Sequence, residues 1–163
     1  METIQIRKAV MDDLPAVEAV YAYARAFMAR NGNPTQWGNT NPTTLMLTQD
    51  IAKGELYVVV NGGAICGAFA FILGEDPTYG YIEGQWHDTR PYGTIHRIAG
   101  NGTYKGLLKC CVEYCEKRVD YLRIDTHRDN HIMQHLITKL GFSYCGIIYI
   151  ANGSPRLAYD RKG

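Results

Sequence analysis

The sequence predicts a mixed α/β fold that forms a single domain over residues 1–163. Three observations predict it. The length suits one domain and is short for two. Segments typical of strands and of helices alternate along the whole chain, which is the pattern of a sheet covered by helices. The sequence carries neither an internal repeat nor a linker or low-complexity stretch that would divide it.

The first strand and the first helix are predicted near the beginning of the sequence. Apolar and polar residues alternate over 4–7, which predicts a strand. Asp12 or Asp13 can cap the helix that follows, whose apolar residues recur at helical spacing. We expect this helix to end at Asn31-Gly32, because glycine adopts the left-handed conformation that commonly closes a helix.

A loop rich in Pro, Asn, Gly and Thr at 33–43 precedes a second predicted helix at 44–53. The segment 55–60 is rich in β-branched residues and is typical of a strand buried within a sheet. Asn61-Gly62-Gly63 is a strong hairpin-turn signal, so we expect 64–73 to be the partner strand.

The second half of the chain begins with a long loop and then alternates strands with helices. Residues 74–91 carry Gly, Pro and Asp at intervals, and a loop of this length inside a compact domain is usually functional. The other predicted elements are strands at 92–99, 121–126, 142–150 and 156–159 and helices at 104–117 and 130–140.

Charge and hydropathy exclude several classes of partner. Lys and Arg total 17 and Asp and Glu total 16, whereas a nucleic-acid binder usually carries a clear basic excess. No apolar run approaches the roughly 20 residues of a membrane span, and no basic stretch with an apolar core opens the sequence. We therefore expect a cytoplasmic protein without a nucleic-acid or membrane partner. The five cysteines predict reduced thiols, and the His and Cys spacings do not favour a metal site.

One loop has the composition of a phosphate-binding site. Residues 101–106 lead from a predicted strand into a helix, whose first N–H groups and positive dipole end suit a pyrophosphate. Gly106 removes a side chain where a ligand could approach the backbone. The next predicted helix opens at Asn130, eleven residues before Gly141-Phe142.

These segments resemble the GNAT superfamily of acetyl-CoA-dependent N-acetyltransferases. The resemblance rests on the order strand, glycine loop, helix and strand, followed by Asn-x-x-Met-x-x-Leu-x-x-x-Leu-Gly-Phe at 130–142, and it extends over essentially the whole chain. It implies a central mixed, mostly antiparallel sheet with about four flanking helices, in which the parallel strands 92–99 and 121–126 splay apart. The segments similar to small bacterial members are Gln36-Trp37, His96–Ala99, Arg123–His127, Cys145–Ile147 and Arg156–Tyr159.

The resemblance implies acetyl-CoA as the acetyl donor, held between the two splayed strands. Pantetheine would pair with the backbone of the first strand, and the pyrophosphate would lie on the loop and the helix start. Thr103 stands where the family has Gln or Arg, and Leu108 where it has a small residue, so the phosphate motif is degenerate. Asn130 matches the family position that hydrogen-bonds the pantetheine arm. The implied cofactor-binding residues are Arg97, Ile98, Ala99, Thr103, Tyr104, Lys105, Gly106, Leu107, Leu108, His127, Asn130 and Met133.

The implied reaction is direct transfer of an acetyl group, within a ternary complex, to a primary amine of a small molecule or peptide. Such an amine has a pKa near 10 and must lose a proton to a base before it attacks. The base candidates are His96, Glu83 and His127. Each has a structural alternative: a hydrogen-bonded core histidine for His96, a solvated loop carboxylate for Glu83, and a turn-stabilising side chain for His127.

Many family members place a tyrosine seven residues after this asparagine to protonate the leaving thiolate, but here that position is Ile137. Tyr144, Tyr149, Cys145 or water could serve instead. We name His96, Glu83 and Tyr144 as the predicted catalytic residues. The alternative function is a GNAT-fold module that binds coenzyme A or another ligand without turnover.

Two tryptophans and two charged strand residues are the predicted acceptor-binding residues. Trp37 and Trp86 fall in the two loops where this family usually builds its acceptor pocket, or each is a hydrophobic plug under its loop. Arg123 and Asp125 are unusual on a strand covered on both faces. With Arg97 they predict either a structural Arg–Asp network or a polar acceptor pocket. We expect a monomer or a homodimer.

Overall fold

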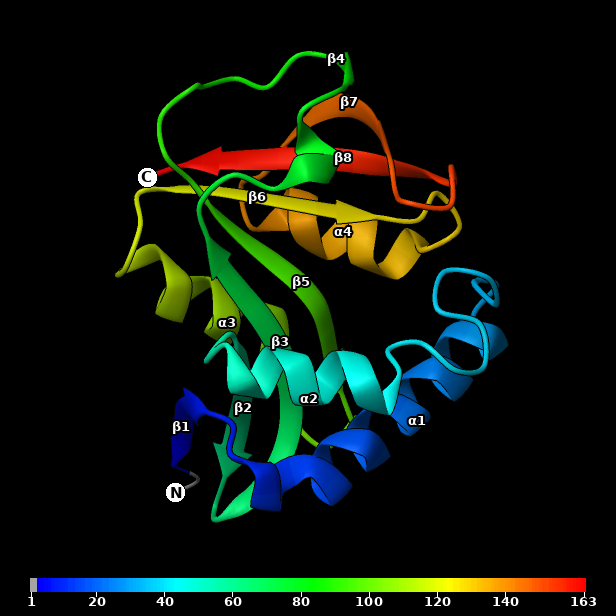
Figure 1. Ribbon diagram of the computed structural model, residues 1–163, viewed down its shortest axis with the longest axis vertical. Coiled ribbons are helices and arrows are strands. Elements are labelled where there is room, and N and C mark those ends of the chain that lie inside the picture. The colour runs from blue at the N-terminus through cyan, green and yellow to red at the C-terminus, as the bar shows by residue number, and fades with distance from the viewer. Residues whose placement is uncertain (1–2) are drawn as a thin grey trace.

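A mixed eight-stranded sheet forms the centre of the computed structural model, which describes residues 3–163 (Figure 1). Its strands lie in the order β1-β2-β3-β5-β6-β8-β7-β4. β5 and β6 run parallel, and every other neighbouring pair in this part of the chain runs antiparallel. The strands are β1 (Ile4–Lys8), β2 (Leu56–Asn61), β3 (Ala64–Leu73), β4 (Glu83–Gly84), β5 (Gly93–Gly100), β6 (Tyr121–Thr126), β7 (Ser143–Tyr149) and β8 (Pro155–Lys162).

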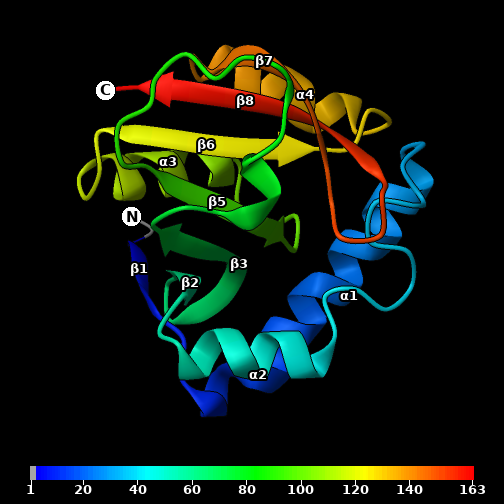
Figure 2. The ribbon, with the colours of Figure 1, turned by 45° about the horizontal axis from the view of Figure 1, so that its top comes forward.

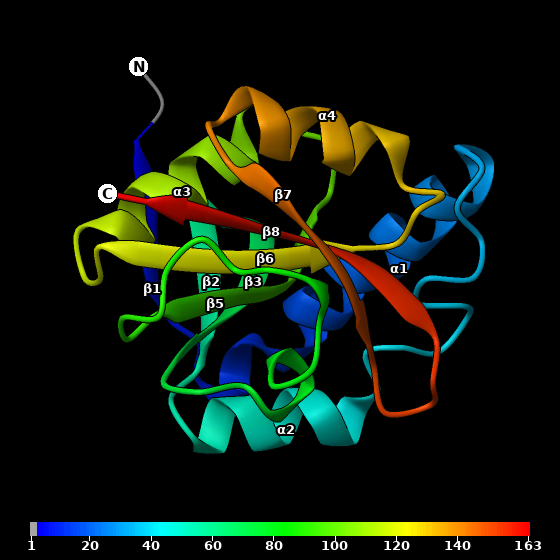
Figure 3. The same cartoon turned by 90° about the horizontal axis from the view of Figure 1, so that it is seen from above.

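Two α-helices cover each face of the sheet (Figure 3). On one face, α1 and α2 bury Tyr21 and Leu47 against β2, β3 and β5. On the other face, α3 buries Cys111 and Cys115 against Phe69 and other apolar residues of the sheet. The helices are α1 (Leu14–Arg30), α2 (Thr44–Ala52), α3 (Leu107–Glu116) and α4 (His131–Lys139), with short 3₁₀ turns at Met11–Asp13 and Pro77–Tyr79. The predicted fold class is confirmed.

The observed elements differ from the predicted ones in three places. α3 begins at Leu107 and not at 104, because Gly106 at its N-cap has a φ of +85°, outside the helical region. The predicted loop 74–91 contains the short strand β4, which pairs with β7. β8 extends over Pro155–Lys162 and is longer than the predicted strand at 156–159.

Asp13 also plays another role than the helix cap that the sequence predicts. Asp13 occupies the N-cap of α1, but its carboxylate does not bind the helix's own N–H groups in the described chain. It accepts hydrogen bonds from Arg7 Nη1 and Nη2 at 2.8 and 3.0 Å and from the Val10 N–H at 2.8 Å. Asp13 therefore ties β1 to the start of α1.

The parallel pair diverges almost as soon as it forms. The register between β5 and β6 contains only Gly93 opposite Leu122 and Thr94 opposite Arg123. Beyond these residues, the strands separate toward their C-terminal ends, as Figure 1 shows. Figure 2 shows the consequence for the whole sheet, with β6, β8 and β7 at one end and β1, β2 and β3 at the other. The predicted splay is confirmed.

A β-bulge in β5 lies at the point of divergence. Ala70 of β3 faces His96 and Ala68 faces Ala99, so Arg97 and Ile98 together stand opposite one residue of β3. Arg97 has a φ of +50°, the only positive φ among the non-glycine residues at 3–163. The extra residue breaks the alternation of the strand, so Ile95 and Ile98 both pack on the α3 side.

Candidate active site

An apolar groove lies where β5 meets α1, α3 and α4. It consists of two adjoining cavities of about 360 and 260 Å³. β5 and the three helices, with the loop after β5, supply the walls. Of the wall residues that the two cavities share, all but Gly100 and Leu136 were predicted to bind the cofactor. These shared residues are Ile98, Ala99, Gly100, Tyr104, Leu107, Met133 and Leu136.

The N-terminus of α3 opens into this groove. Gly106 is both its N-cap and a wall residue, and among the described residues no side chain caps the first turn. The first N–H groups of a helix lack intrahelical partners and carry the positive end of the dipole, so they can bind a phosphate. Lys109 and Lys139, which the sequence analysis missed, line the same cavity and add positive charge. Thr103 and Lys105 lie in the loop but are not wall residues.

A narrow passage leads from the groove into the opening between β5 and β6. This cavity of about 30 Å³ is lined by Ile98 and Met133, which also line the groove, and by Ile124 and Thr126 of β6. Two buried polar atoms of the lining residues have no hydrogen-bond partner within residues 3–163: Thr126 Oγ1 and Arg97 Nε. An unpaired buried polar atom costs about 1–3 kcal/mol, so these two atoms are candidates to pair with a ligand.

A third hollow, which we call the outer cavity, lies at the other end of the passage and has a volume of about 200 Å³. Four residues line both the passage and the outer cavity, so the two adjoin: Gln36, Trp37, Arg97 and Asp125. The remaining wall residues are Asn41, Pro42, Met46, His96, Ile150 and Arg156. The groove, the passage and the outer cavity thus follow one another across the opening between β5 and β6, and we call this row of adjoining cavities the path through the sheet.

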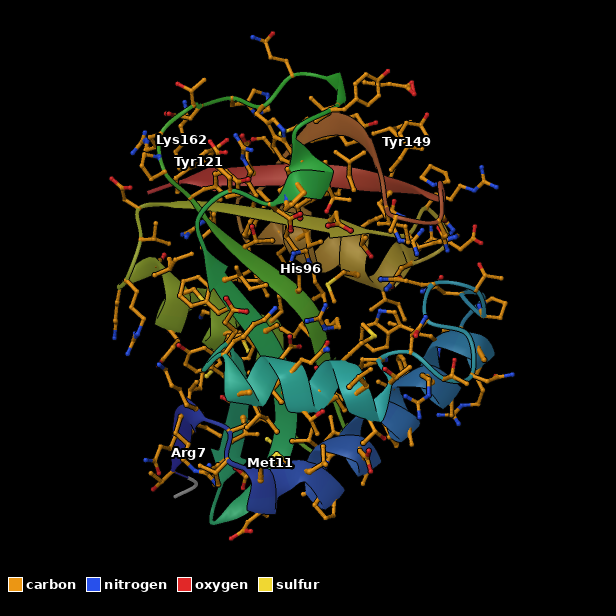
Figure 4. All side chains as sticks on the ribbon, in the orientation of Figure 1. Arg7, Met11, His96, Tyr121, Tyr149 and Lys162 are labelled. Atoms are coloured by element: carbon orange, nitrogen blue, oxygen red, sulfur yellow. The ribbon has the colours of Figure 1, made fainter. Side chains whose placement is uncertain are left out.

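His96 forms a hydrogen-bonded pair with Asp76 in the wall of the outer cavity. Its Nε2 lies 2.6 Å from Asp76 Oδ2, and both side chains are mostly buried. Burial raises the pKa of Asp76, but hydrogen bonds from His96 and Thr78 outweigh that effect and lower the pKa to about 2. Asp76 is therefore ionised at neutral pH and can accept the Nε2 proton of the imidazole. Figure 4 shows His96 near the middle of the molecule.

Asp125 and Trp37 also line this cavity. Asp125 Oδ2 accepts a hydrogen bond from Tyr79 Oη at 2.6 Å, and burial together with this carboxylate raises the pKa of Tyr79 well above its ordinary value. Trp37 packs edge-on against Tyr21, with ring centroids 5.5 Å apart. Tyr21 in turn donates to the Arg97 carbonyl at 2.6 Å. Trp37 is therefore both packed and part of the cavity wall.

Trp86 and Arg123 lie together under the 74–91 loop, and neither is a wall residue of the groove, the passage or the outer cavity. The Arg123 guanidinium lies between the Trp86 and Tyr92 rings, 4.0 Å from each centroid. It also donates to the Asp88 carbonyl at 3.1 Å. The expected Arg–Asp network thus differs in its partners, because Arg123 stacks on aromatic rings and Arg97 pairs with Asp50 of α2 at 2.5 Å.

Two predicted catalytic residues lie outside the path through the sheet. Glu83 is exposed on β4, where it accepts a hydrogen bond from Tyr149 Oη. Tyr144 is 54% exposed and packs against Tyr159. In Figure 4, Tyr149 lies at the upper edge of the molecule, away from His96. Neither Glu83 nor Tyr144 is therefore placed with the other predicted site residues.

Asn130 and His127 are both engaged in the turn that begins α4. Asn130 caps the helix, with its Oδ1 accepting from the Met133 N–H, and its Nδ2 donates to Gln36 Oε1; each distance is 3.1 Å. Asn130 lines both the groove and the passage. His127 Nδ1 accepts from the Asp129 N–H at 3.0 Å, and burial and Arg156 lower the pKa of His127. These contacts favour the turn-stabilising role for His127.

The family's tyrosine position and Cys145 also lie away from the path. Ile137, which stands at the tyrosine position, is fully buried in the core. Cys145 forms a cluster with His87 and Asp160, in which the ligand-type atoms all lie within 4.8 Å of one another. His87 Nδ1 lies 2.6 Å from Asp160 Oδ1. Burial, with a contribution from Asp160, raises the pKa of the Cys145 thiol to about 12, so this cysteine lacks the lowered pKa of a reactive thiol.

Comparison with solved structures decides the family. A GNAT-family acetyltransferase from Streptococcus agalactiae is 32% identical, with a TM-score of 0.88, over 98% of this chain and 95% of the other. This protein belongs to the GNAT family of acetyltransferases. A GNAT-family acetyltransferase from Listeria monocytogenes shares the fold at 20% identity and a TM-score of 0.72, over 98% of this chain and 95% of the other. A ribosomal-protein-alanine N-acetyltransferase from Brucella melitensis also shares the fold. It is 19% identical with a TM-score of 0.65, over 98% of this chain and 99% of the other.

No protein-family model and no curated protein matches this GNAT sequence. The structural neighbours support acetyl transfer as its general activity. Within residues 3–163, none of the helices has the length and apolar character to cross a membrane.

Several residues of this GNAT site were missed by sequence reasoning, each for a physical reason. Asp76 lies in a loop and Arg156 near the start of β8, and only the tertiary structure brings Asp76 to His96 and Arg156 to the outer cavity. Thr126 was part of a quoted motif, but its unpaired hydroxyl is a property of the packing. Lys109 and Lys139 look like ordinary solvated helix lysines in the sequence. The one available signal was their position in or near the helices that the resemblance implied.

Proposed function

We propose that this protein transfers an acetyl group from acetyl-CoA directly to a primary amine of a small molecule. The observation that carries the proposal is the path through the sheet. It joins an apolar groove, with an uncapped helix N-terminus, to a cavity lined by charged side chains and an Asp–His pair. Such a path keeps a long donor and a small acceptor on opposite sides of the opening between β5 and β6.

The residues of the groove and the passage fit acetyl-CoA. The free N–H groups at Leu107 and Leu108, with Lys109 and Lys139 nearby, would hold the pyrophosphate. The apolar walls would hold the pantetheine arm. Because β5 leaves its edge facing β6 unpaired beyond Thr94, backbone groups there are open to the amides of that arm. Thr126 Oγ1 supplies a further buried polar group that the protein itself leaves unpaired.

The chain's own residues would prepare the amine for the reaction. Acetyl-CoA supplies an acetyl thioester, to whose carbonyl carbon the amine nitrogen bonds while the carbon–sulfur bond breaks and the thiolate leaves. A primary amine is mostly protonated at neutral pH, so a base must first take its proton. With Asp76 accepting the Nε2 proton of His96, Nδ1 of the imidazole keeps a lone pair for the proton of the amine.

This proposal assigns no catalytic role to Glu83, Tyr144 or Cys145, none of which lines the path. Direct transfer needs no covalent enzyme intermediate, which agrees with the raised pKa of the Cys145 thiol. Because the implied tyrosine position is the buried Ile137, we propose that water protonates the leaving thiolate.

The test measures release of free thiol from acetyl-CoA with a panel of primary amines, for the wild type and for His96→Gln, Asp76→Asn and His135→Gln. We expect His96→Gln to lower kcat/KM about 100-fold or more, the usual contribution of a general base. Asp76→Asn should also lower kcat/KM, because the carboxylate that accepts from Nε2 no longer holds the imidazole in the tautomer that leaves Nδ1 free. His135 is exposed on α4 and serves as the control.

Unchanged turnover in His96→Gln would remove the base assignment. Thermal stabilisation by acetyl-CoA without thiol release from any amine would favour the non-catalytic alternative. The absence of both stabilisation and release would overturn the proposal.

A further inference from the structure

The outer cavity holds a buried cation that makes no direct ion pair within the described residues. Arg156 is 5% exposed. Its Nη1 donates to Ser154 Oγ at 2.6 Å and to the Pro155 carbonyl at 2.9 Å, and its Nη2 donates to the Gln36 carbonyl at 3.2 Å. All these acceptors are neutral, and within residues 3–163 no carboxylate lies at ion-pair distance from its guanidinium. The Asp125 carboxylate favours the charged form of Arg156 from beyond ion-pair distance, so what the guanidinium lacks is an anion in direct contact.

The same cavity holds an anion that likewise makes no direct ion pair within the described residues. Asp125 accepts from the neutral Tyr79 hydroxyl and forms no salt bridge in the described part of the chain. The other charged groups of the wall are already compensated, since Arg97 pairs with Asp50 and His96 pairs with Asp76. The outer cavity therefore presents one open cation and one open anion to whatever enters it.

The two charges are placed in a definite order along the path. Asp125 on β6 lies opposite Ala158 on β8, and Arg156 is two residues from Ala158 on the same face of β8. The charges are thus diagonal neighbours on adjacent strands, a spacing that long side chains can span, yet they form no ion pair in the described part of the chain. Asp125 lines both the passage and the outer cavity, whereas Arg156 lines only the outer cavity. The anion is therefore nearer the passage, where the acetyl group would arrive.

We infer that the acceptor is a small α-amino acid, with its ammonium group at Asp125 and its carboxylate on Arg156. This inference rests on the proposed function and names the substrate class for it. The amine end would lie beside the passage and within the cavity that His96 lines. The carboxylate would supply the anion that Arg156 lacks, in the bidentate geometry that guanidinium favours. The volume of about 200 Å³ is smaller than a typical pocket for a drug-sized ligand and suits a molecule of this size.

The reaction balances as an acetyl transfer. The ammonium loses one proton to His96, its nitrogen bonds to the acetyl carbon, and the carbon–sulfur bond of the thioester breaks. The nitrogen gives up a second proton to water, and water protonates the leaving thiolate. The products are an N-acetyl amino acid and free coenzyme A. The α-carboxylate takes no part in bond making and only fixes the position of the amine.

The experiment compares L-α-amino acids with the amines that lack only the carboxylate, for example leucine with 3-methylbutylamine, at equal acetyl-CoA concentration. Thiol release is measured for the wild type, Arg156→Gln and Arg161→Gln. Arg161 lies on the same strand and pairs with Glu116 instead of lining the cavity, so it is the matched control. We expect the amino acid to be preferred by the wild type, and Arg156→Gln to raise KM for the amino acid about tenfold or more with little change for the matched amine.

Binding of the amino acid itself is measured in parallel, as the shift in melting temperature with free coenzyme A present, so that the readout does not depend on turnover. Equal or faster transfer to the amines overturns the inference and leaves the proposed function standing. Amino-acid binding that Arg156→Gln abolishes, without any transfer, supports the assigned ligand and overturns the function. If the amino acid neither binds nor is acetylated, both the inference and the proposed function are overturned. If Arg156→Gln does not fold, Asp125→Asn replaces it, with weakened binding of amino acid and amine alike expected.

Discussion

At the scale of single residues, the informative feature of the site is polar atoms that the protein leaves unused. Thr126 lines the passage and is 1% exposed as a residue. Its Oγ1 atom has no hydrogen-bond partner within residues 3–163. A buried hydroxyl without a partner lowers stability. A ligand in the passage that pairs with this hydroxyl would offset that cost.

Replacing Thr126 by valine separates these two effects. Thr126→Val keeps the shape and removes the unpaired hydroxyl, so we expect the free energy of unfolding to rise by about 1 kcal/mol. In the same variant, we expect kcat/KM to fall roughly tenfold, the loss of about one hydrogen bond to the bound donor. Chemical denaturation and thiol-release kinetics measure the two quantities.

Thr94 provides the matched control. Its Oγ1 is also buried without a partner in the described chain, but it lies where β5 and β6 are still paired and outside the passage. Thr94→Val should therefore gain similar stability and keep full activity. A loss of activity in Thr94→Val equal to that in Thr126→Val would assign the effect to packing of the sheet and not to the passage.

The residues of the site were predicted best where the course of the backbone places them. The family resemblance implied Ile98, Ala99, Tyr104, Leu107 and Met133 as cofactor-binding residues, and all five line the groove. Side chains that depend on long-range partners were predicted less well. Arg123 was expected at the acceptor, yet it stacks on two aromatic rings from the 74–91 loop and its far end, contacts that no local pattern encodes.

At the scale of elements, the start of α3 positions the phosphate end of the groove. Gly106 has a φ of +85°, and a Cβ built there would meet no atom within 4 Å among the described residues. The glycine is therefore required for its backbone conformation and not for close packing. A side chain at this position would project into the groove that Gly106 lines.

A bulky residue at this position should block the donor without unfolding the protein. Gly106→Trp costs about 1–2 kcal/mol of stability, the strain of a left-handed conformation in a non-glycine residue. At an acetyl-CoA concentration of 100 times Kd, we expect the wild type to gain about 2.7 kcal/mol of stability, seen as a higher melting temperature. In Gly106→Trp we expect no such gain. Differential scanning fluorimetry with and without acetyl-CoA measures both effects.

Gly153→Trp is the matched control, because Gly153 has a φ of +84° and equally open surroundings in the described structure but lies in the β7–β8 turn. It should lose similar stability and keep the response to acetyl-CoA. If both variants lose the response, the effect comes from strain and the placement of the phosphate site is wrong.

Element boundaries were predictable only where a local signal marks them. The hairpin at Asn61-Gly62-Gly63 is such a case. No local signal marks β4, which consists of two residues whose backbone lies close to that of β7. A Cβ on Gly84 would lie 2.1 Å from the Cys145 carbonyl oxygen. The bulge at Arg97 likewise arises from pairing with β3 and leaves no mark in the sequence.

At the scale of the whole molecule, the sheet works as two parts that join along a short seam. β5 and β6 pair at only two register positions, and everything beyond that seam is open to the groove on one side and to the outer cavity on the other. The order of elements and the resemblance predicted this parallel, diverging pair. Of the charged residues that line the outer cavity, the sequence analysis named His96, Arg97 and Asp125 but gave no site role to Arg156, which β8 brings there.

The central claim is that the acetyl donor enters through the groove and reaches the acceptor cavity between β5 and β6. A crystal structure of the protein with acetyl-CoA tests it most directly. The claim predicts the pyrophosphate on the first N–H groups of α3 and the thioester sulfur in the passage between Ile98 and Thr126, with its acetyl group directed toward Asp125 and His96. Density for acetyl-CoA on any other surface, with the passage filled by protein side chains, would contradict it.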